Sequence, residues 1–334
     1  MCGLGTVAEL AAMIQAGRIL LLAGTETLLA QLPAGRWIGG SAVAYLGNPN
    51  GATERDRIFY SDLTDHAQTA EILLLDASEL PGLARRYPEN GFSFLILPGL
   101  SELLVSFARD AADYPGLYNS PLIGWISAVD LAGPLARPKI FAGNGQAHAE
   151  HGALMHVSLP RRLAAQIDVI NLFSTGKGAA ITFSEDGLSA TSCLVDGVPQ
   201  NLAAYIMRHR IDTNLPLIAD YNGAAMNVSI RAVDAQAQCV DFFAPVFKTL
   251  TYRFANPLRD FPAAFDRAIA TIEPGDIAFA CTCVLNYRQA RLEGRRAGPF
   301  TGPVTFGEIA YIALNQTLAC LSIVSLDNDE SDDF

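Results

Sequence analysis

The stretch that decides the fold is RILLLAGTETLLAQL, residues 18–32. An apolar run of strand type ends at a glycine, Thr25 follows in the place of a helix N-cap, and an apolar helical stripe comes next. SFLILPGLSELLVSF (93–107) repeats this order, and each copy precedes a second strand with recurring Ile-Gly and Ser-Ala-Val, at 37–46 and 122–131. The pattern predicts a duplicated strand–helix–strand unit in the N-terminal half; the alternative is chance similarity between apolar strands.

The sequence changes character after the second copy. Short strands with turn signals between them replace the strand–helix alternation, and two segments, 198–210 and 261–272, have helical spacing. We therefore predict a mixed α/β fold of two packed αβ portions, in which mixed β-sheets are flanked by helices. The N-terminal portion is expected to span 1–198 and the C-terminal portion 199–326, and an acidic disordered tail is expected at 327–334.

Composition narrows the function classes. The chain has 334 residues, of which 50% are hydrophobic and 17% charged, and its net charge is −11. Such an acidic surface repels phosphate backbones and disfavours nucleic-acid binding. Six cysteines are too few for a disulfide scaffold, and the sequence has neither a convincing signal peptide nor an apolar run of membrane-spanning length. We expect a cytoplasmic protein that does not bind membranes.

A polar triad interrupts the apolar segment VTFGEIAYIALNQTLACLSIV, residues 304–324. Glu308, Asn315 and Gln316 stand among residues that suit a core. Burying a carboxylate or an amide without partners costs several kcal/mol, so each must be satisfied by other groups. They either cap backbone groups, which is a structural role, or line a pocket whose polar groups converge on a ligand.

Two further groups of residues could carry chemistry. Cys281 precedes an arginine-rich loop and could act as the nucleophile of a hydrolase or transferase, with His156 or His209 as the base; the alternative is core packing. His148 and His151, together with His156, could bind a metal ion or haem. The alternative for these histidines is a solvated turn, because their spacing does not bring the three rings together.

A family resemblance follows from several short motifs in order. GPVTFGEIAYIALNQTLACLSI (302–323) resembles the closing motif of FIST domains, and GDIAFACTCVL (275–285) is similar to the family's apolar strand ending in Ser-Cys. The Ile-Gly strands described above resemble the family's repeated strands, and the match covers roughly residues 17–325. The chain departs from the pattern where the family has Gly-Arg after Ser-Cys, and Arg288 or Arg291 would have to substitute.

The resemblance implies a sensory domain that binds a small polar, amino-acid-like ligand and signals through a partner, such as a histidine kinase or a cyclase. It also implies that haem could bind, since one branch of the family carries it. We expect a ligand cleft between the two halves. Glycines, which lack a side chain, would let the backbone come close to a ligand in this cleft. The predicted site residues are Gly39, Gly40, Ser41, Cys281, Arg288, Glu308, Asn315 and Gln316.

Overall fold

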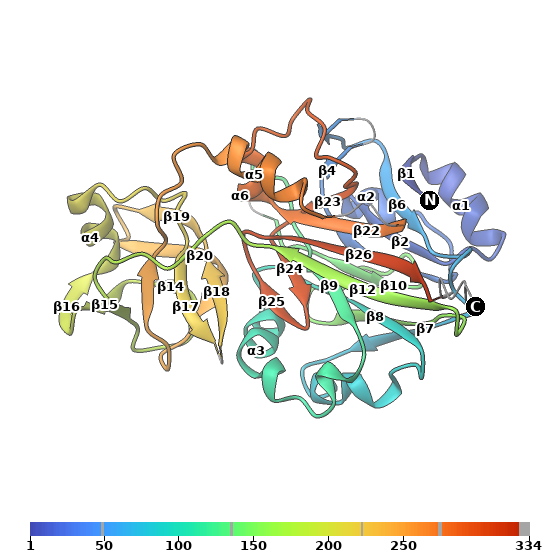
Figure 1. Cartoon of the computed structure of the whole chain (residues 1–334), viewed down its shortest axis with the longest axis horizontal. Helices are drawn as coiled ribbons and strands as arrows, with labels where there is room; N and C mark the ends of the chain where they lie inside the picture. Colours follow the sequence, from blue (N-terminus) through green and yellow to red (C-terminus); the bar gives the residue numbers. More distant parts are fainter. Residues whose placement is uncertain (48–49, 134–135, 222, 273–275, 327–334) are drawn as a thin grey trace, which may run out of the picture.

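A computed structural model describes residues 1–47, 50–133, 136–221, 223–272 and 276–326 of the chain. Five sheets form two parts, which we call the body and the lobe (Figure 1). The body holds three mixed sheets and most of the helices, so the predicted mixed α/β class is confirmed. The predicted acidic tail lies outside the described residues.

The first sheet of the body contains the first copy of the duplicated unit. Its strands run in the order β1 (Cys2–Gly5), β6 (Ile58–Asp62), β2 (Leu20–Gly24), β3 (Trp37–Ser41) and β10 (Ile140–Ala142). Strands β2 and β3 pair in parallel, and α2 (Glu26–Leu29) connects them. Thr25 caps α2 as predicted, because its hydroxyl accepts the N–H of Leu28.

The second sheet contains the second copy. Its order is β25 (Ile312–Leu314), β24 (Gly307–Ala310), β9 (Leu122–Ile126), β8 (Gly91–Leu97), β11 (Gly152–Ser158) and β7 (Thr69–Leu75). Strands β8 and β9 are parallel and are joined through α3 (Glu102–Asp110), which Ser101 caps. The predicted duplication is therefore present in the backbone pairing as well as in the sequence.

The third sheet contains a third copy that the sequence analysis did not find. Its order is β12 (Leu163–Ile170), β26 (Leu318–Ser325), β22 (Asp276–Cys283), β23 (Gly302–Thr305), β4 (Ala44–Leu46) and β5 (Ala52–Thr53). Strands β22 and β23 are parallel, and α6 (Val284–Gln289) lies between them in the chain. The arginine-rich segment after Cys281, expected to be a loop, is therefore helical as far as Gln289.

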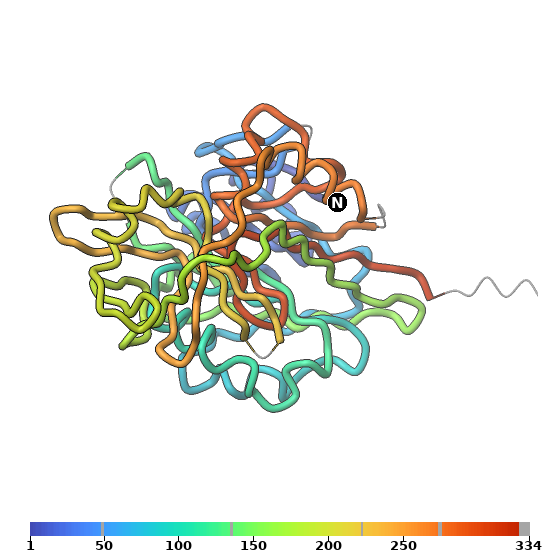
Figure 2. The backbone as a smooth tube through the Cα atoms, turned by 60° about the vertical axis from the view of Figure 1, so that its left-hand side comes forward, coloured from blue at the N-terminus to red at the C-terminus, as the bar shows by residue number. Residues whose placement is uncertain are grey.

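The three copies exchange strands in a closed cycle. After the second parallel strand of each copy, the next strand joins a different sheet: β4 pairs with β23, β24 pairs with β9, and β10 pairs with β3. Each first parallel strand also has an antiparallel return strand beside it: β6, β11 or β26. The body is thus a pseudo-threefold arrangement in which blue, cyan and red segments of the chain intermix (Figure 2).

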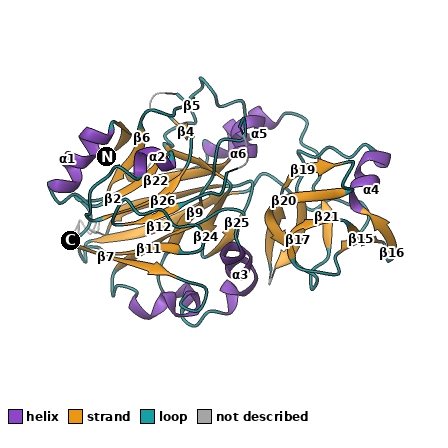
Figure 3. Cartoon of the chain, turned by 180° about the vertical axis from the view of Figure 1, so that it is seen from behind, coloured by secondary structure: helices purple, strands orange, loops and turns teal. Residues whose placement is uncertain are grey.

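The three sheets share one buried core. Trp125 of the second sheet lies fully buried against Phe279 of the third, with ring centroids 5.2 Å apart, and against Phe94. Ile38 and other apolar residues of the first sheet belong to the same cluster. Helices lie outside the strands of the body (Figure 3). The remaining ones are α1 (Val7–Gln15), α5 (Phe261–Ile269), and the short 3-10 helices Leu80–Arg86, Ala111–Asp113 and Leu117–Asn119.

The lobe is inserted between β12 and α5 and extends from one side of the body (Figure 1). One of its sheets runs β16 (Val198–Asn201), β15 (Ser192–Val195), β13 (Ile181–Thr182), β21 (Tyr252–Phe254), β17 (Leu217–Tyr221) and β18 (Ala224–Val228). The other runs β14 (Gly187–Ala190), β20 (Cys239–Val246) and β19 (Ile230–Asp234), and α4 (Leu202–His209) completes the lobe. The boundary expected between residues 198 and 199 falls inside β16, and both sheets of the lobe contain strands from either side of it. Among the described residues, no helix is long and apolar enough to cross a membrane.

Candidate functional site

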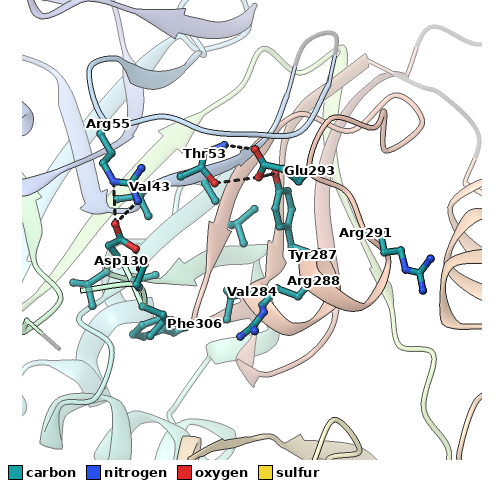
Figure 4. A pocket seen from close by; sticks show the side chains of 16 residues that line it. Val43, Thr53, Arg55, Asp130, Val284, Tyr287, Arg288, Arg291, Glu293 and Phe306 are labelled. Atoms are coloured by element: carbon teal, nitrogen blue, oxygen red, sulfur yellow. Dashed lines mark hydrogen bonds and ion pairs between the residues drawn. The ribbon is translucent and has the colours of Figure 1, made fainter. Parts of the chain in front are cut away.

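A cavity of about 440 Å³ lies where strands from all three sheets end (Figure 4). Its lining follows the carboxyl ends of the second parallel strands: Val43 and Ala44 after β3, residues 128–132 after β9, and Val304 and Phe306 around the end of β23. Helix α6 supplies Val284, Tyr287 and Arg288, and the β5 region supplies Thr53 and Arg55. Ligands of α/β proteins commonly bind at the carboxyl ends of parallel strands, so this position marks a candidate binding site.

Two carboxylates of the cavity already have partners. Arg55 Nε donates to Asp130 Oδ2 at 2.9 Å, and the backbone N–H of Ala132 together with Arg55 holds the pKa of Asp130 below its usual value. Glu293 accepts hydrogen bonds from Thr53 Oγ1 at 3.0 Å and from the hydroxyl of Tyr287 at 2.8 Å. These contacts fix both carboxylates in place.

Arg288 and Arg291 are exposed cations of the cavity. No hydrogen bond or ion pair joins either guanidinium to another residue that the structure describes. In Figure 4 the side chain of Arg288 reaches toward the space between Val284 and Phe306, whereas Arg291 extends away from the other labelled residues. A free guanidinium over an apolar wall is suited to bind a carboxylate or another planar anion through paired N–H groups.

The predicted site residues are divided by the structure. Arg288 lines the cavity. Gly39, Gly40, Ser41, Cys281, Glu308, Asn315 and Gln316 do not line it and are buried in the body. The sequence therefore identified one residue of this cavity together with seven residues that lie in the packing around it.

Glu308 on β24 is fully buried and satisfied by neighbouring hydroxyl and backbone groups. Its Oε2 accepts the hydroxyl of Thr317 at 2.6 Å and the N–H of Thr317 at 3.2 Å, and its Oε1 lies 3.2 Å from Thr305 Oγ1. Burial raises the pKa of Glu308 to about 8, against the opposing effect of these hydrogen bonds. At neutral pH the side chain is therefore mostly a neutral acid inside the core.

Asn315 and Gln316 connect the body to the lobe. The amide oxygen of Asn315 accepts the N–H of Ser229 at 3.0 Å, and its Nδ2 donates to the carbonyl of Phe306 at 2.6 Å. Gln316 accepts the hydroxyl of Ser229 at 2.7 Å and donates to the carbonyl of Asn214 at 2.9 Å. Both amides cap backbone groups, which is the structural alternative for this segment, and Asn315 also fixes Phe306 in the cavity wall.

Gly39 and Gly40 lie against other protein atoms, not against open space. A Cβ at Gly39 would lie 2.9 Å from the carbonyl oxygen of Leu22, and a Cβ at Gly40 would lie 2.8 Å from Trp125 Nε1. Ser41 accepts the backbone N–H of Lys139 at 2.9 Å. The close approach predicted for these glycines is therefore present, but the neighbour is the core of the body.

The variant Gly40→Ala tests this assignment. We expect it to lower the free energy of unfolding by about 1–3 kcal/mol, because the added methyl group overpacks the contact with Trp125. Ligand affinity, measured on the folded variant, should stay within about twofold of wild type. Urea unfolding measures the stability, and calorimetric titration measures the ligand affinity. A variant of unchanged stability that no longer binds the ligand would show that Gly40 belongs to the binding site.

Cys281 on β22 has the environment of a core residue. It is fully buried, and its Sγ lies 3.7 Å from the carbonyl oxygen of Gly124. Burial, and then the charge of Glu308, raise the pKa of this thiol well above its usual value, so a thiolate does not form at neutral pH. His156 contacts Ser93 instead, and the ring of His209 packs at a tilt against Tyr205 in the lobe. These contacts give no support to the predicted cysteine nucleophile.

The histidines named as metal or haem ligands lie in two places. The rings of His148 and His151 are 5.3 Å apart. His156 is buried on β11, where its Nδ1 lies 2.7 Å from Ser93 Oγ and burial lowers its pKa. Among the described residues, no group of three or more His, Cys, Asp or Glu side chains could hold a metal ion.

Sequence reasoning missed most of the cavity because its lining comes from separate loops. Asp130, Tyr287 and Glu293 carry no motif, and they come together only through the exchange of strands between sheets. One signal was available. Val43, Val129 and Phe306 each follow the second strand of a copy, so recognition of the third copy would have placed the three strand ends together.

The fold and the cavity define a class of protein: a three-sheet α/β body with an inserted β-rich lobe and an open pocket at its strand ends. The chain belongs to the family of unknown function DUF6976, whose profile matches residues 5–324. A search of curated proteins found no match. The resemblance to FIST domains stays a prediction.

Proposed function

We propose that the protein binds a small amino-acid-like molecule in the cavity between α6 and the β4–β5 hairpin. The observation that carries the proposal is the unpaired guanidinium of Arg288 in this cavity. Three arginines, Arg55, Arg288 and Arg291, and two carboxylates line the cavity, in a chain whose net charge is −11. A lining with one more cation than anion favours a ligand that carries a carboxylate.

The remaining lining fits the other parts of such a ligand. Glu293 and Asp130 are fixed carboxylates that can accept an ammonium group. An ionised carboxylate has several acceptor sites, and the hydrogen bonds described above occupy only some of them. Val284 and Phe306, with neighbouring aliphatic residues, offer apolar contact for a side chain. A volume of about 440 Å³ lies within the usual range of small-molecule sites.

The signalling part of the proposal rests on the resemblance to FIST domains. A sensory protein of this kind would transmit ligand binding to a partner protein, such as a histidine kinase or a cyclase. Asn315 connects the cavity to the lobe, since it hydrogen-bonds both the cavity residue Phe306 and Ser229 of the lobe. A ligand that moves Phe306 would therefore act on the contact between body and lobe.

The direct test is calorimetric titration with the twenty amino acids. We expect at least one to bind, and we expect Arg288→Gln to weaken it about tenfold or more, because a charge-assisted hydrogen bond contributes about 1.5 kcal/mol or more. Arg267→Gln is the matched control, because Arg267 is exposed on α5 and lies outside the cavity. If no amino acid binds, or if Arg288→Gln binds as tightly as Arg267→Gln, the proposed function is wrong.

A further inference from the structure

A second cavity adjoins the first at the junction of the body and the lobe. Its volume is about 280 Å³, and it shares Leu131 and Arg288 with the first cavity. Phe243 and Arg231 of the lobe form part of its lining, together with Leu285 of α6. Arg288 therefore stands between two compartments of one larger site.

The second compartment carries an excess of positive charge. Arg231 on β19 forms one ion pair, from its Nη2 to Asp241 Oδ2 at 2.7 Å. Its Nε is buried and has no hydrogen-bond partner among the described residues. Asp241 is paired with Arg231 alone, and no other hydrogen bond or ion pair joins the guanidinium of Arg231 or of Arg288 to a described residue.

The surroundings make this charge effective. Leu131, Phe243 and Leu285 are apolar, and charge-assisted hydrogen bonds are stronger where water is partly excluded. An ammonium group would be repelled by Arg231 and Arg288, and an aliphatic group would leave the buried Nε of Arg231 unsatisfied. A group with anionic oxygens satisfies the donors and neutralises the charge at once.

We infer that the ligand carries a second anionic group, which enters the lobe-side compartment and lies between Arg288 and Arg231. This inference rests on the proposed function, because the first anionic group of the same ligand occupies the larger cavity. Arg288 can serve both groups, since its planar fork presents N–H donors along more than one edge. The ligand class is then an acidic amino acid or a related compound with two anionic groups, and its binding bridges α6 of the body and β19 of the lobe.

Calorimetric titration with L-glutamate and L-glutamine tests the inference, because the two molecules have nearly the same shape and differ in the charge of the second group. We expect wild-type protein to bind L-glutamate at least tenfold more tightly than L-glutamine. O-Phospho-L-serine distinguishes the two sources of anionic oxygens: tighter binding than that of L-glutamate assigns a phosphate to the compartment, and weaker binding assigns a carboxylate.

Three variants test whether Arg231 is responsible for the preference for L-glutamate over L-glutamine. Arg231→Gln should reduce the preference for L-glutamate to about threefold or less, and Arg231→Lys, which keeps a cation beside Asp241, should fold even if the glutamine variant does not. Asp241→Asn should increase the preference, because it removes the carboxylate that competes for Arg231.

Equal binding of L-glutamate and L-glutamine by the wild type, or an unchanged preference in both Arg231 variants, would overturn the inference. Tight binding of a monoanionic amino acid, lost in Arg288→Gln, would still support the proposed function; absence of all binding would end both.

Discussion

Replacement of Glu308 by glutamine should stabilise the protein at pH 8 and leave its stability at pH 5 nearly unchanged. The pKa of this buried carboxyl is raised from 4.5 to about 8 in the folded protein. The folded state therefore binds more protons than the unfolded state between these values, so the contribution of Glu308 is complete below pH 4.5 and is lost as the pH rises through 8. The loss reaches about 3–5 kcal/mol at a conversion of about 1.4 kcal/mol per pH unit.

Urea unfolding of both proteins at pH 5, 6, 7 and 8 measures this difference. The glutamine variant should keep most of the hydrogen bonds, since its amide oxygen can accept from Thr317 and its NH₂ group can donate to Thr305. Glu9→Gln provides a control of opposite sign. The N–H and hydroxyl of Thr6 hold the pKa of Glu9 below its usual value, so that variant should lose stability at neutral pH relative to acid pH. A difference between wild type and Glu308→Gln that does not vary with pH would contradict the account of Glu308.

Truncation of Trp125 should be the most destabilising single change in the core. Trp125 is fully buried where the three sheets meet, against Phe94, Phe279 and Gly40. We expect Trp125→Ala to lower the free energy of unfolding by about 3–5 kcal/mol, because it opens a cavity that the sheets cannot close.

Trp125→Phe separates packing from hydrogen bonding. The indole Nε1 is buried without a hydrogen-bond partner among the described residues, so the phenylalanine variant also removes an unsatisfied donor. Its loss of stability should be well below that of the alanine variant. Urea unfolding at one pH compares the three proteins, and an alanine variant within about 1 kcal/mol of wild type would show that the shared core does not depend on this residue.

Local sequence signals were sufficient for the repeated units. Thr25 and Ser101 mark helix starts in two copies, and the parallel strands on either side follow from their apolar runs. The third copy was missed because its connecting helix has no side-chain cap and a long loop precedes its second strand. The strands of the lobe pair across residue 198, where the sequence places a boundary, and pairing partners are not encoded in local periodicity.

The candidate site shows the same limit. Burial of Glu308, Asn315 and Gln316 was predictable from their apolar neighbours, but the identity of their partners was not. Thr317 donates to Glu308, and Ser229 from the lobe donates to both amide oxygens, so the polar groups converge on the protein itself. The cavity instead forms from residues that follow strand ends in different sheets. Only the exchange of β4, β24 and β10 between sheets brings those ends together.

A crystal structure of the protein grown with the amino acid that binds most tightly tests the central claim most directly. The account predicts density for the ligand in the cavity between α6 and the β4–β5 hairpin, with its carboxylate within about 3 Å of the guanidinium of Arg288. Density for the ligand beside Glu308 or Cys281, or a ligand in the cavity whose carboxylate faces away from Arg288, would contradict it.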